Sequence, residues 1–155
     1  MLSQKARYAL RAMVELARTE QTQGDGGGRP QLTAGELALR ADAPRKFLEA
    51  ILLELSRHHL VISRRGKFGG YTLARGADEI SFAEIIRVID GPLALAPCVS
   101  PRLNFRKCDD CPDKDACSLR EALLMARDAT AGVLDSYTLA AAASSSASRD
   151  VVSAL

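Results

Sequence analysis

The sequence predicts a mostly α-helical protein with one β-hairpin, and three observations support that prediction. Apolar residues recur at helical spacing in several separate segments of the 155-residue chain. Three four-residue stretches begin with Ser or Thr and end in Glu, which is the pattern of a helix capping box. Two short β-prone runs, 60–63 and 71–74, flank a glycine-containing turn and predict a hairpin.

The first helix is predicted from about Ser3 to Arg18. Its apolar face consists of Ala6, Leu10, Met13, Val14 and Ala17. The following stretch 21–30, QTQGDGGGRP, predicts a flexible loop, because ordering a run of glycines has a high entropic cost.

Two short helices are predicted after this loop. Thr33 and Glu36 form the capping box of the first, which ends at Arg40. After a turn at 41–43, Pro44 suits the first turn of the second helix, where its missing N–H costs nothing. The side chains expected to point inward are Phe47, Leu48, Ile51, Leu52 and Leu55. Those left on the other side are Arg45, Lys46, Glu49 and Ala50.

Two short helices followed by a hairpin have the order of a winged helix-turn-helix. Between Leu55 and Ala77 the chain has no Asp or Glu, although its net charge is only +2. The basic residues of that stretch are Arg57, Arg64, Arg65, Lys67 and Arg75. Such a stripe is typical of a surface that binds an anionic polymer, although from charge alone a solvated face is an equal alternative.

The pattern predicts how each part would meet double-stranded DNA. Arg45 and Lys46 lie in the first turn of the second helix, where a recognition helix meets bases and phosphates. Thr33 could contact a phosphate through its hydroxyl and the neighbouring amides. Arg64, Arg65 and Lys67 lie on the wing, and a slim basic hairpin suits the minor groove. A winged helix that binds protein instead of DNA is the alternative. The adjacent His58 and His59 are interpreted as phosphate contacts or surface residues.

The second half predicts a helix, a long loop and a longer helix. Ser81 and Glu84 form a capping box for a helix that ends at Gly91–Pro92. Its apolar residues are Phe82, Ile85, Ile86 and Ile89. The stretch 91–117 has little periodicity, and a loop of that length is usually functional or disordered.

A third capping box, Ser118 to Glu121, predicts a long helix with a heptad seam. The seam consists of Leu119, Leu123, Ala126, Thr130, Val133 and Tyr137. This spacing predicts packing along a second helix, in another copy of the chain or within the same one. The Ala/Ser-rich tail is predicted to be disordered. The resulting division is a winged helix-turn-helix at 1–77, a cysteine loop and dimerisation helix at 78–140, and a tail at 141–155.

All four cysteines lie in the long loop, at Cys98, Cys108, Cys111 and Cys117. Thiolates are soft ligands that suit iron-sulfur clusters or zinc, and the spacing alone separates neither from the other nor from unligated thiols. The N-terminus of the last helix would favour a thiolate at Cys117. No signal peptide or membrane-spanning run is visible, so we expect a cytoplasmic protein without a membrane partner, in which thiols stay reduced.

The chain also lacks the patterns of an enzyme. No nucleophile with a plausible base, no phosphate loop and no pair of catalytic carboxylates is recognisable. The sequence therefore predicts a binding protein.

Four blocks of the sequence resemble the Rrf2 family of bacterial regulators, which includes the IscR, NsrR and RirA types. They are LSQKARYALRAMVELA at 2–17, KFLEAILLEL at 46–55, RRGKFGGYTLAR at 64–75, and the cysteine loop with its flanks. The resemblance implies a homodimer that joins through the long C-terminal helix and binds a pseudo-palindromic operator. It also implies that Arg65 enters the minor groove and that Glu49 contributes to operator choice.

The same resemblance implies an iron-sulfur cluster on Cys98, Cys117 and one of the middle pair, for which the spacing favours Cys111. Some members have a histidine three residues after the last cysteine, where this chain has Arg120, which cannot be a ligand. Others take a carboxylate from the first helix, where this chain has Arg7 and Tyr8. Cys108 could supply the missing ligand, and a 2Fe-2S cluster is favoured over 4Fe-4S. The sequence thus predicts a regulator that senses iron, nitric oxide or redox state. The alternatives are a regulator with structural zinc or a thiol switch, and a protein-interaction module.

Overall fold

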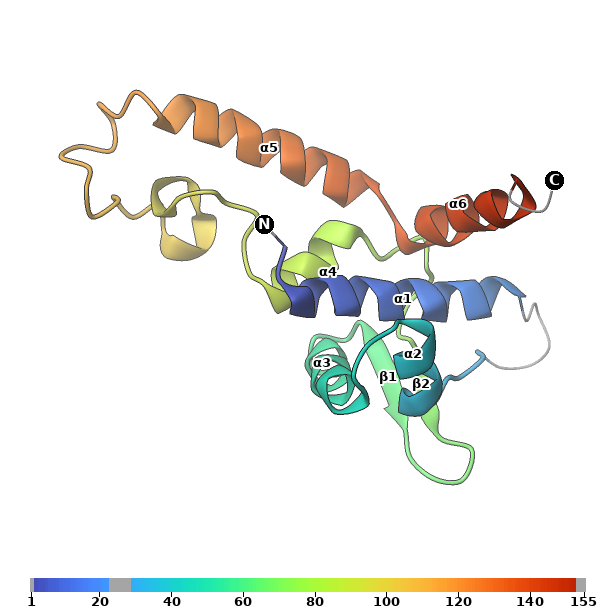
Figure 1. Ribbon diagram of the computed structural model, residues 1–155. Coiled ribbons are helices and arrows are strands. Elements are labelled where there is room, and N and C mark those ends of the chain that lie inside the picture. The colour runs from blue at the N-terminus through green and yellow to red at the C-terminus, as the bar shows by residue number, and fades with distance from the viewer. Residues whose placement is uncertain (1, 23–28, 153–155) are drawn as a thin grey trace.

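The computed structural model describes residues 2–22 and 29–152, with side chains as far as Ser145. It contains six helices in that part of the chain, two single-turn 3-10 segments and one two-stranded antiparallel sheet (Figure 1). A mostly helical fold with a β wing is therefore confirmed. No helix within the described ranges is long and apolar enough to cross a membrane.

The first helix, α1 (Gln4–Thr22), runs through the middle of the molecule (Figure 1). Its buried face is built largely from small side chains, which allow neighbouring elements to approach closely. The helix continues past the predicted end at Arg18, since Thr19 is buried and its hydroxyl donates to the Glu15 carbonyl oxygen (2.8 Å). Residues 21 and 22 of the loop predicted at 21–30 belong to α1, and its part at 23–28 lies outside the described residues.

The helix-turn-helix consists of α2 (Ala34–Arg40) and α3 (Arg45–Arg57). The Thr33 capping box is complete, with Glu36 N donating to Thr33 Oγ1 (3.2 Å) and Thr33 N donating to Glu36 Oε2 (2.8 Å). Four of the five apolar side chains predicted to point inward from α3 are buried. Phe47 was wrongly predicted to be inward. It is 42% exposed, and its ring packs edge-on against Tyr8 at 5.9 Å between centroids.

The wing is the hairpin of β1 (Val61–Arg64) and β2 (Gly70–Leu73), paired in register from Val61 with Leu73 to Arg64 with Gly70. Two glycines make its turn possible. Gly66 has φ +109°, a backbone region that side chains disfavour. A Cβ on Gly69 would lie 2.3 Å from the Arg64 carbonyl oxygen, so the two arms can close only around glycine.

Helix α4 (Phe82–Ile89) begins as predicted, with Glu84 N donating to Ser81 Oγ (3.2 Å). The Glu84 carboxylate binds Arg75 instead of completing a capping box. Gly91, at φ +90°, ends the helix as the sequence predicted. The cysteine loop then contains two 3-10 segments, η1 (Pro97–Val99) and η2 (Pro101–Leu103).

The capping box at Ser118 was wrongly predicted. Helix α5 begins at Arg120 and runs to Ser136, and its N-cap residue Leu119 makes no side-chain cap. Arg120 N instead donates to the Cys117 carbonyl oxygen (3.2 Å), so a turn at 117–120 precedes the helix. A pattern that satisfies the capping rule locally can thus be overruled by the loop before it.

The tail was wrongly predicted to be disordered up to 152. Helix α6 (Leu139–Val152) packs against α1, and Leu139 and Ala143 are buried there. Its start is fixed by two backbone bonds, Leu139 N to Ile80 O (3.0 Å) and Ala140 N to Ala77 O (2.9 Å). Residues 153–155 of the predicted tail lie outside the described residues.

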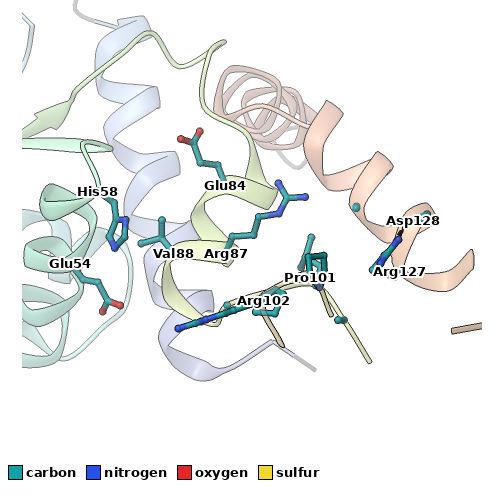
Figure 2. A pocket seen from close by; sticks show the side chains of 14 residues that line it. Glu54, His58, Glu84, Arg87, Val88, Pro101, Arg102, Arg127 and Asp128 are labelled. Atoms are coloured by element: carbon teal, nitrogen blue, oxygen red, sulfur yellow. Dashed lines mark hydrogen bonds and ion pairs between the residues drawn. The ribbon is translucent and has the colours of Figure 1, made fainter. Parts of the chain in front are cut away.

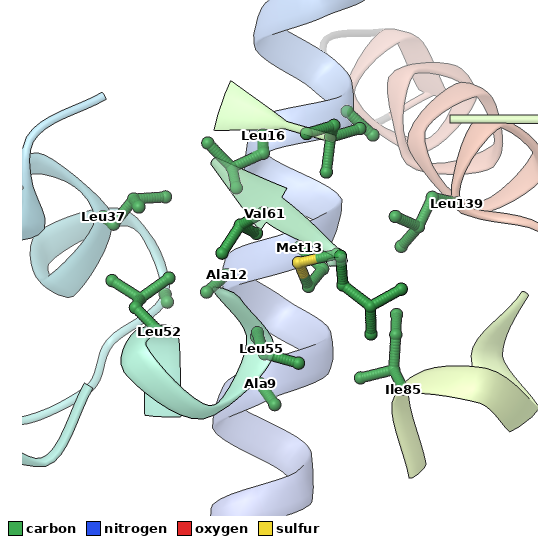
Figure 3. Packing of buried hydrophobic residues seen from close by; sticks show 14 of the residues in the cluster. Ala9, Ala12, Met13, Leu16, Leu37, Leu52, Leu55, Val61, Ile85 and Leu139 are labelled. Carbon is green, nitrogen blue, oxygen red and sulfur yellow. The ribbon is translucent and has the colours of Figure 1, made fainter. Parts of the chain in front are cut away.

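One hydrophobic core joins these elements (Figure 3). Ala9, Ala12 and Met13 of α1 lie at its centre, with Leu52 and Leu55 of α3 on one side. Ile85 and Leu139, from α4 and α6, close the other side (Figure 3). The core is therefore continuous across the domain boundary predicted at residue 77, and that division remains a prediction.

Candidate functional site

The N-terminal turn of α3 presents charge to solvent. Arg45 and Lys46 are exposed. Arg45 Nε lies 3.0 Å from Glu49 Oε1, one turn along the helix, and both side chains are on the exposed face. Glu49 can therefore hold the Arg45 guanidinium in place on the surface that the sequence assigned to a recognition helix.

Thr33 lies near this surface, but its hydroxyl is already engaged. Oγ1 lies 2.8 Å from Glu36 Oε2 and also accepts the Glu36 N–H. The neighbouring backbone amides are the better donors to a phosphate at this position.

The wing carries the second cluster of charge. Arg64, Arg65 and Lys67 are all exposed, and within the described residues none of them forms an ion pair. Arg75, from the same acid-free stretch, differs because it pairs with Glu84 at 2.6 Å. Figure 1 shows α2, α3 and the wing on one side of α1, with α5 on the other. Short helix, recognition helix and basic hairpin thus share one side of the molecule.

Sequence reasoning missed Phe68, which lies at the wing tip between Lys67 and Gly69. Its side chain is 87% exposed, and Lys67 Nζ lies 5.7 Å from the ring centroid. An aromatic residue between basic residues and glycines in a hairpin turn was the available signal.

The cysteine loop brings its thiols together in two pairs. Cys98 is buried and lies beside Cys108, and Cys111 lies beside Cys117 and donates from its Sγ to the Asp113 carbonyl oxygen (3.1 Å). Burial, followed by these contacts, raises the pKa of Cys98 and of Cys111. All four thiols are free, and the last three are half-buried.

The four thiols are chemically suitable ligands for a metal ion or an iron-sulfur cluster. Their present arrangement fits such a group less well. Within the described ranges, no three His, Cys, Asp or Glu side chains are already arranged to hold a metal ion. Two polar atoms close to the cysteines in sequence, Ser100 Oγ and Arg120 Nε, are buried without a hydrogen-bond partner. Such donors can stabilise thiolates or the sulfurs of a cluster. Binding would require the thiols to lose protons and the two pairs to close around the group.

The loop is also attached to α5. Arg127 donates to the Val99 carbonyl oxygen (2.9 Å), next to Cys98, and its guanidinium lies 6.0 Å from the centroid of the Phe105 ring. At the other end of the loop, Cys117 lies in the turn that opens α5. The loop is therefore joined to α5 at two points, and a conformational change in the loop can be transmitted to the helix through both.

A cavity of about 810 Å³ lies where α3, α4, α5 and the start of the loop meet (Figure 2). Glu54 and His58 enter it from the end of α3, and Arg102 enters it from the loop (Figure 2). Arg87 of α4 also lines it and forms a two-point ion pair with Asp135 of α5, at 2.6 and 2.8 Å. The packing of α5 against the body of the protein thus depends in part on an ion pair.

We expect Asp135→Asn to loosen this attachment and to lower the free energy of unfolding by about 0.5–1 kcal/mol, because both partners are largely exposed. The hydrogen bonds from Arg87 hold the pKa of Asp135 below its usual value. The contribution is therefore present at neutral pH and is lost as the pH falls below about 4.

Urea unfolding at several pH values would measure the effect. Asp128→Asn is the matched control, since Asp128 pairs with its neighbour Arg127 and does not bridge two helices. A difference between Asp135→Asn and the parent that does not shrink as the pH falls below about 4 would contradict this explanation.

Comparisons with known proteins support the fold and the functional class. The sequence model of the Rrf2 family, described as an iron-dependent transcriptional regulator, matches residues 2–145. A putative HTH-type transcriptional regulator, rrf2-like, from Rhodobacter capsulatus is 41% identical over 140 residues, which are 90% of this chain and 89% of that protein.

Solved structures support the same fold and functional class. CymR, the global cysteine regulator of B. subtilis, matches with a TM-score of 0.71 at 31% identity, covering 93% of this chain and 96% of that one. IscR of T. potens matches with a TM-score of 0.70 at 26% identity, covering 94% and 88%. The resemblance predicted from the sequence blocks is confirmed: this chain belongs to the Rrf2 family of winged-helix, DNA-binding transcriptional regulators, which are not enzymes.

Proposed function

We propose that this protein is a homodimeric regulator that binds a pseudo-palindromic operator and responds to iron, nitric oxide or redox state through an iron-sulfur cluster. The observation that supports it best is the combination of a basic surface on one side of α1 with four paired thiols in a loop attached to α5. The cytoplasm is the compartment that suits both DNA binding and reduced thiols.

In this proposal α3 enters the major groove. Its first turn places Arg45 and Lys46 against bases and phosphates, with Glu49 orienting Arg45. Thr33 contacts phosphate through neighbouring amides. Arg65 enters the minor groove at the wing, with Arg64 and Lys67 on the flanking phosphates.

The seam of α5 would join two chains. Leu119 and Val133 are each 66% exposed in the single chain, and within the described part of the chain no α5 residue is buried. The apolar side chains of an amphipathic helix are removed from water when a second helix packs over them, which stabilises the pair. A dimer would also place two recognition helices at a fixed spacing, which a pseudo-palindromic operator requires.

For sensing, we propose that Cys98, Cys111, Cys117 and Cys108 are the ligands of the cluster, with 2Fe-2S favoured. When bound, the cluster would supply a redox-active group that iron, oxidants or nitric oxide can change. The chain's own contribution is mechanical. Ligation would fix the loop between α4 and α5, and release would let the two winged domains change their spacing.

The thiol pairs also favour a second candidate function. Cys98 lies beside Cys108 and Cys111 lies beside Cys117, so a thiol switch or a structural zinc could replace the cluster. Anaerobic purification with a visible spectrum and metal analysis separates these functions. Iron with sulfide supports the cluster, whereas zinc or disulfides without iron contradict it.

The wing provides a direct test of DNA binding. We expect Arg65→Ala to weaken binding to a cognate operator by roughly 1–3 kcal/mol, because an arginine in the minor groove is lost. Lys67→Ala should act as the loss of one phosphate contact in each subunit and reduce the salt slope by about 1 per subunit.

Affinity would be measured at several salt concentrations by fluorescence anisotropy. Arg106→Ala, which removes the same charge from the cysteine loop, is the control. If Arg65→Ala and Arg106→Ala bind the operator alike, the wing does not enter the groove.

A further inference from the structure

The tip of the wing displays an aromatic ring that nothing in the described chain covers. Phe68 is 87% exposed, although a phenyl ring of this size normally seeks burial in a protein or an interface. The Lys67 ammonium lies 5.7 Å from the ring centroid.

The backbone of the wing holds the ring out. Residues 66–69 form a tight turn closed by Gly69 N donating to Gly66 O (2.9 Å), and Lys67 and Phe68 are its two central residues. The turn depends on glycine at both ends, through the positive φ of Gly66 and the close approach of Gly69 to Arg64 O. The backbone of the hairpin therefore places a cation and a ring at its tip.

The charge around the ring identifies the kind of partner. Arg64, Arg65 and Lys67 lie within four residues of it in the sequence, and no acidic residue lies anywhere in 55–77. This environment suits the minor groove, whose potential is negative and whose walls of deoxyribose are apolar. Apolar side chains beside arginines are used in this way by proteins that bind the minor groove.

We propose that Phe68 is a DNA-binding residue whose ring packs into the minor groove of the operator, against the sugars next to Arg65. The inference rests on the proposed operator binding and adds an apolar contact to its ionic ones. An apolar contact releases no counterions, so its loss lowers affinity without changing the salt dependence.

The test uses the full-length protein and a duplex that the parent selects from a random-sequence library. Burying roughly 60 Å² of ring surface corresponds to about a tenfold change in affinity for each wing, so Phe68→Ala, which removes the ring from both wings of the dimer, should bind about 100-fold more weakly with an unchanged salt slope. Phe68→Leu, which retains an apolar tip, should recover most of the loss. Ile62→Ala is the matched control, since Ile62 is an exposed apolar residue of β1 and lies away from the tip.

Hydroxyl-radical footprinting reports the contact directly. Phe68→Ala should lose protection of the sugars under the wing, whereas Ile62→Ala should keep it. Equal affinity and an equal footprint for Phe68→Ala and the parent would overturn the proposal, as would a loss accompanied by a smaller salt slope. If the parent itself selects no duplex, the proposed operator binding has failed, which is a different result.

Discussion

A glutamate in place of Leu123 on α5 is expected to make the protein monomeric and to weaken operator binding by about two orders of magnitude. In a dimer joined along the seam, the new carboxylate would be buried without a partner, at a free-energy cost that two contacting helices cannot offset. Operator affinity falls when the dimer is lost, because two separate monomers must then bind the two half-sites independently instead of as one linked pair.

A second substitution separates loss of the dimer from loss of the fold. Leu123 is half-buried in the single chain, so Leu123→Glu could also destabilise it. Val133 lies on the same seam but is 66% exposed, and Val133→Glu should therefore leave the monomer folded. Met125→Glu is the matched control, because Met125 is 68% exposed and lies off the seam.

Light scattering would give the mass of each variant, and circular dichroism would show whether it is folded. We expect Leu123→Glu and Val133→Glu to be monomeric and Met125→Glu to be dimeric. Dimers in all three variants would show that the chains meet through a different surface.

The elements that could be predicted from the sequence are those with a local cause. Thr33 and Glu36 satisfy each other's backbone donors, and that needs no other part of the chain. The hairpin follows from two β-prone runs and the glycines between them, so its position was predicted to within one residue. The exposed charges of α3 and the wing are part of the same local patterns.

The errors arose where tertiary contacts decide. The tail has a composition typical of disorder, yet Leu139 and Ala143 are buried as α6 packs against α1. Phe47 fits the apolar spacing of α3, yet it lies at the edge of the core against Tyr8. At the candidate site, the ion pair of Arg75 with Glu84 removes one charge from the basic stripe, and the sequence shows no sign of it.

In the cysteine loop, some features have a local cause in the sequence and others depend on tertiary contacts. The presence of four candidate thiol ligands in one loop could be predicted from the sequence, and their ligation of a metal group remains a proposal. The two contacting pairs depend on how the loop folds back on itself, and no periodic pattern encodes that path. The contact of Arg127 with Val99 O, which ties the loop to α5, is likewise visible only in three dimensions.

Cys117→Ala is expected to abolish the visible absorption of the anaerobically reconstituted protein and to change operator affinity at least several-fold. Cys117 lies in the turn that opens α5 and contacts Cys111. If Cys117 is a ligand as proposed, its loss removes the one nearest to the long helix in the sequence, so the loop could no longer fix α4 against α5. Half-site spacing is a geometric condition, and a small shift between the two winged domains changes affinity strongly.

Cys108→Ala is the more specific test of the fourth ligand. It shows whether Cys108 takes the place of the histidine that some family members have where this chain has Arg120. Cys108 contacts Cys98, so as the fourth ligand its removal should weaken or convert the cluster and shift the spectrum. An unchanged spectrum would make it an extra thiol.

Both variants and the parent would be reconstituted anaerobically, with iron, sulfide, absorbance and operator binding measured side by side. A Cys117→Ala protein that forms a normal cluster and binds the operator like the parent, with and without the cluster, would disprove sensing through this loop. A normal cluster with altered binding would instead assign Cys117 to the mechanical link with α5.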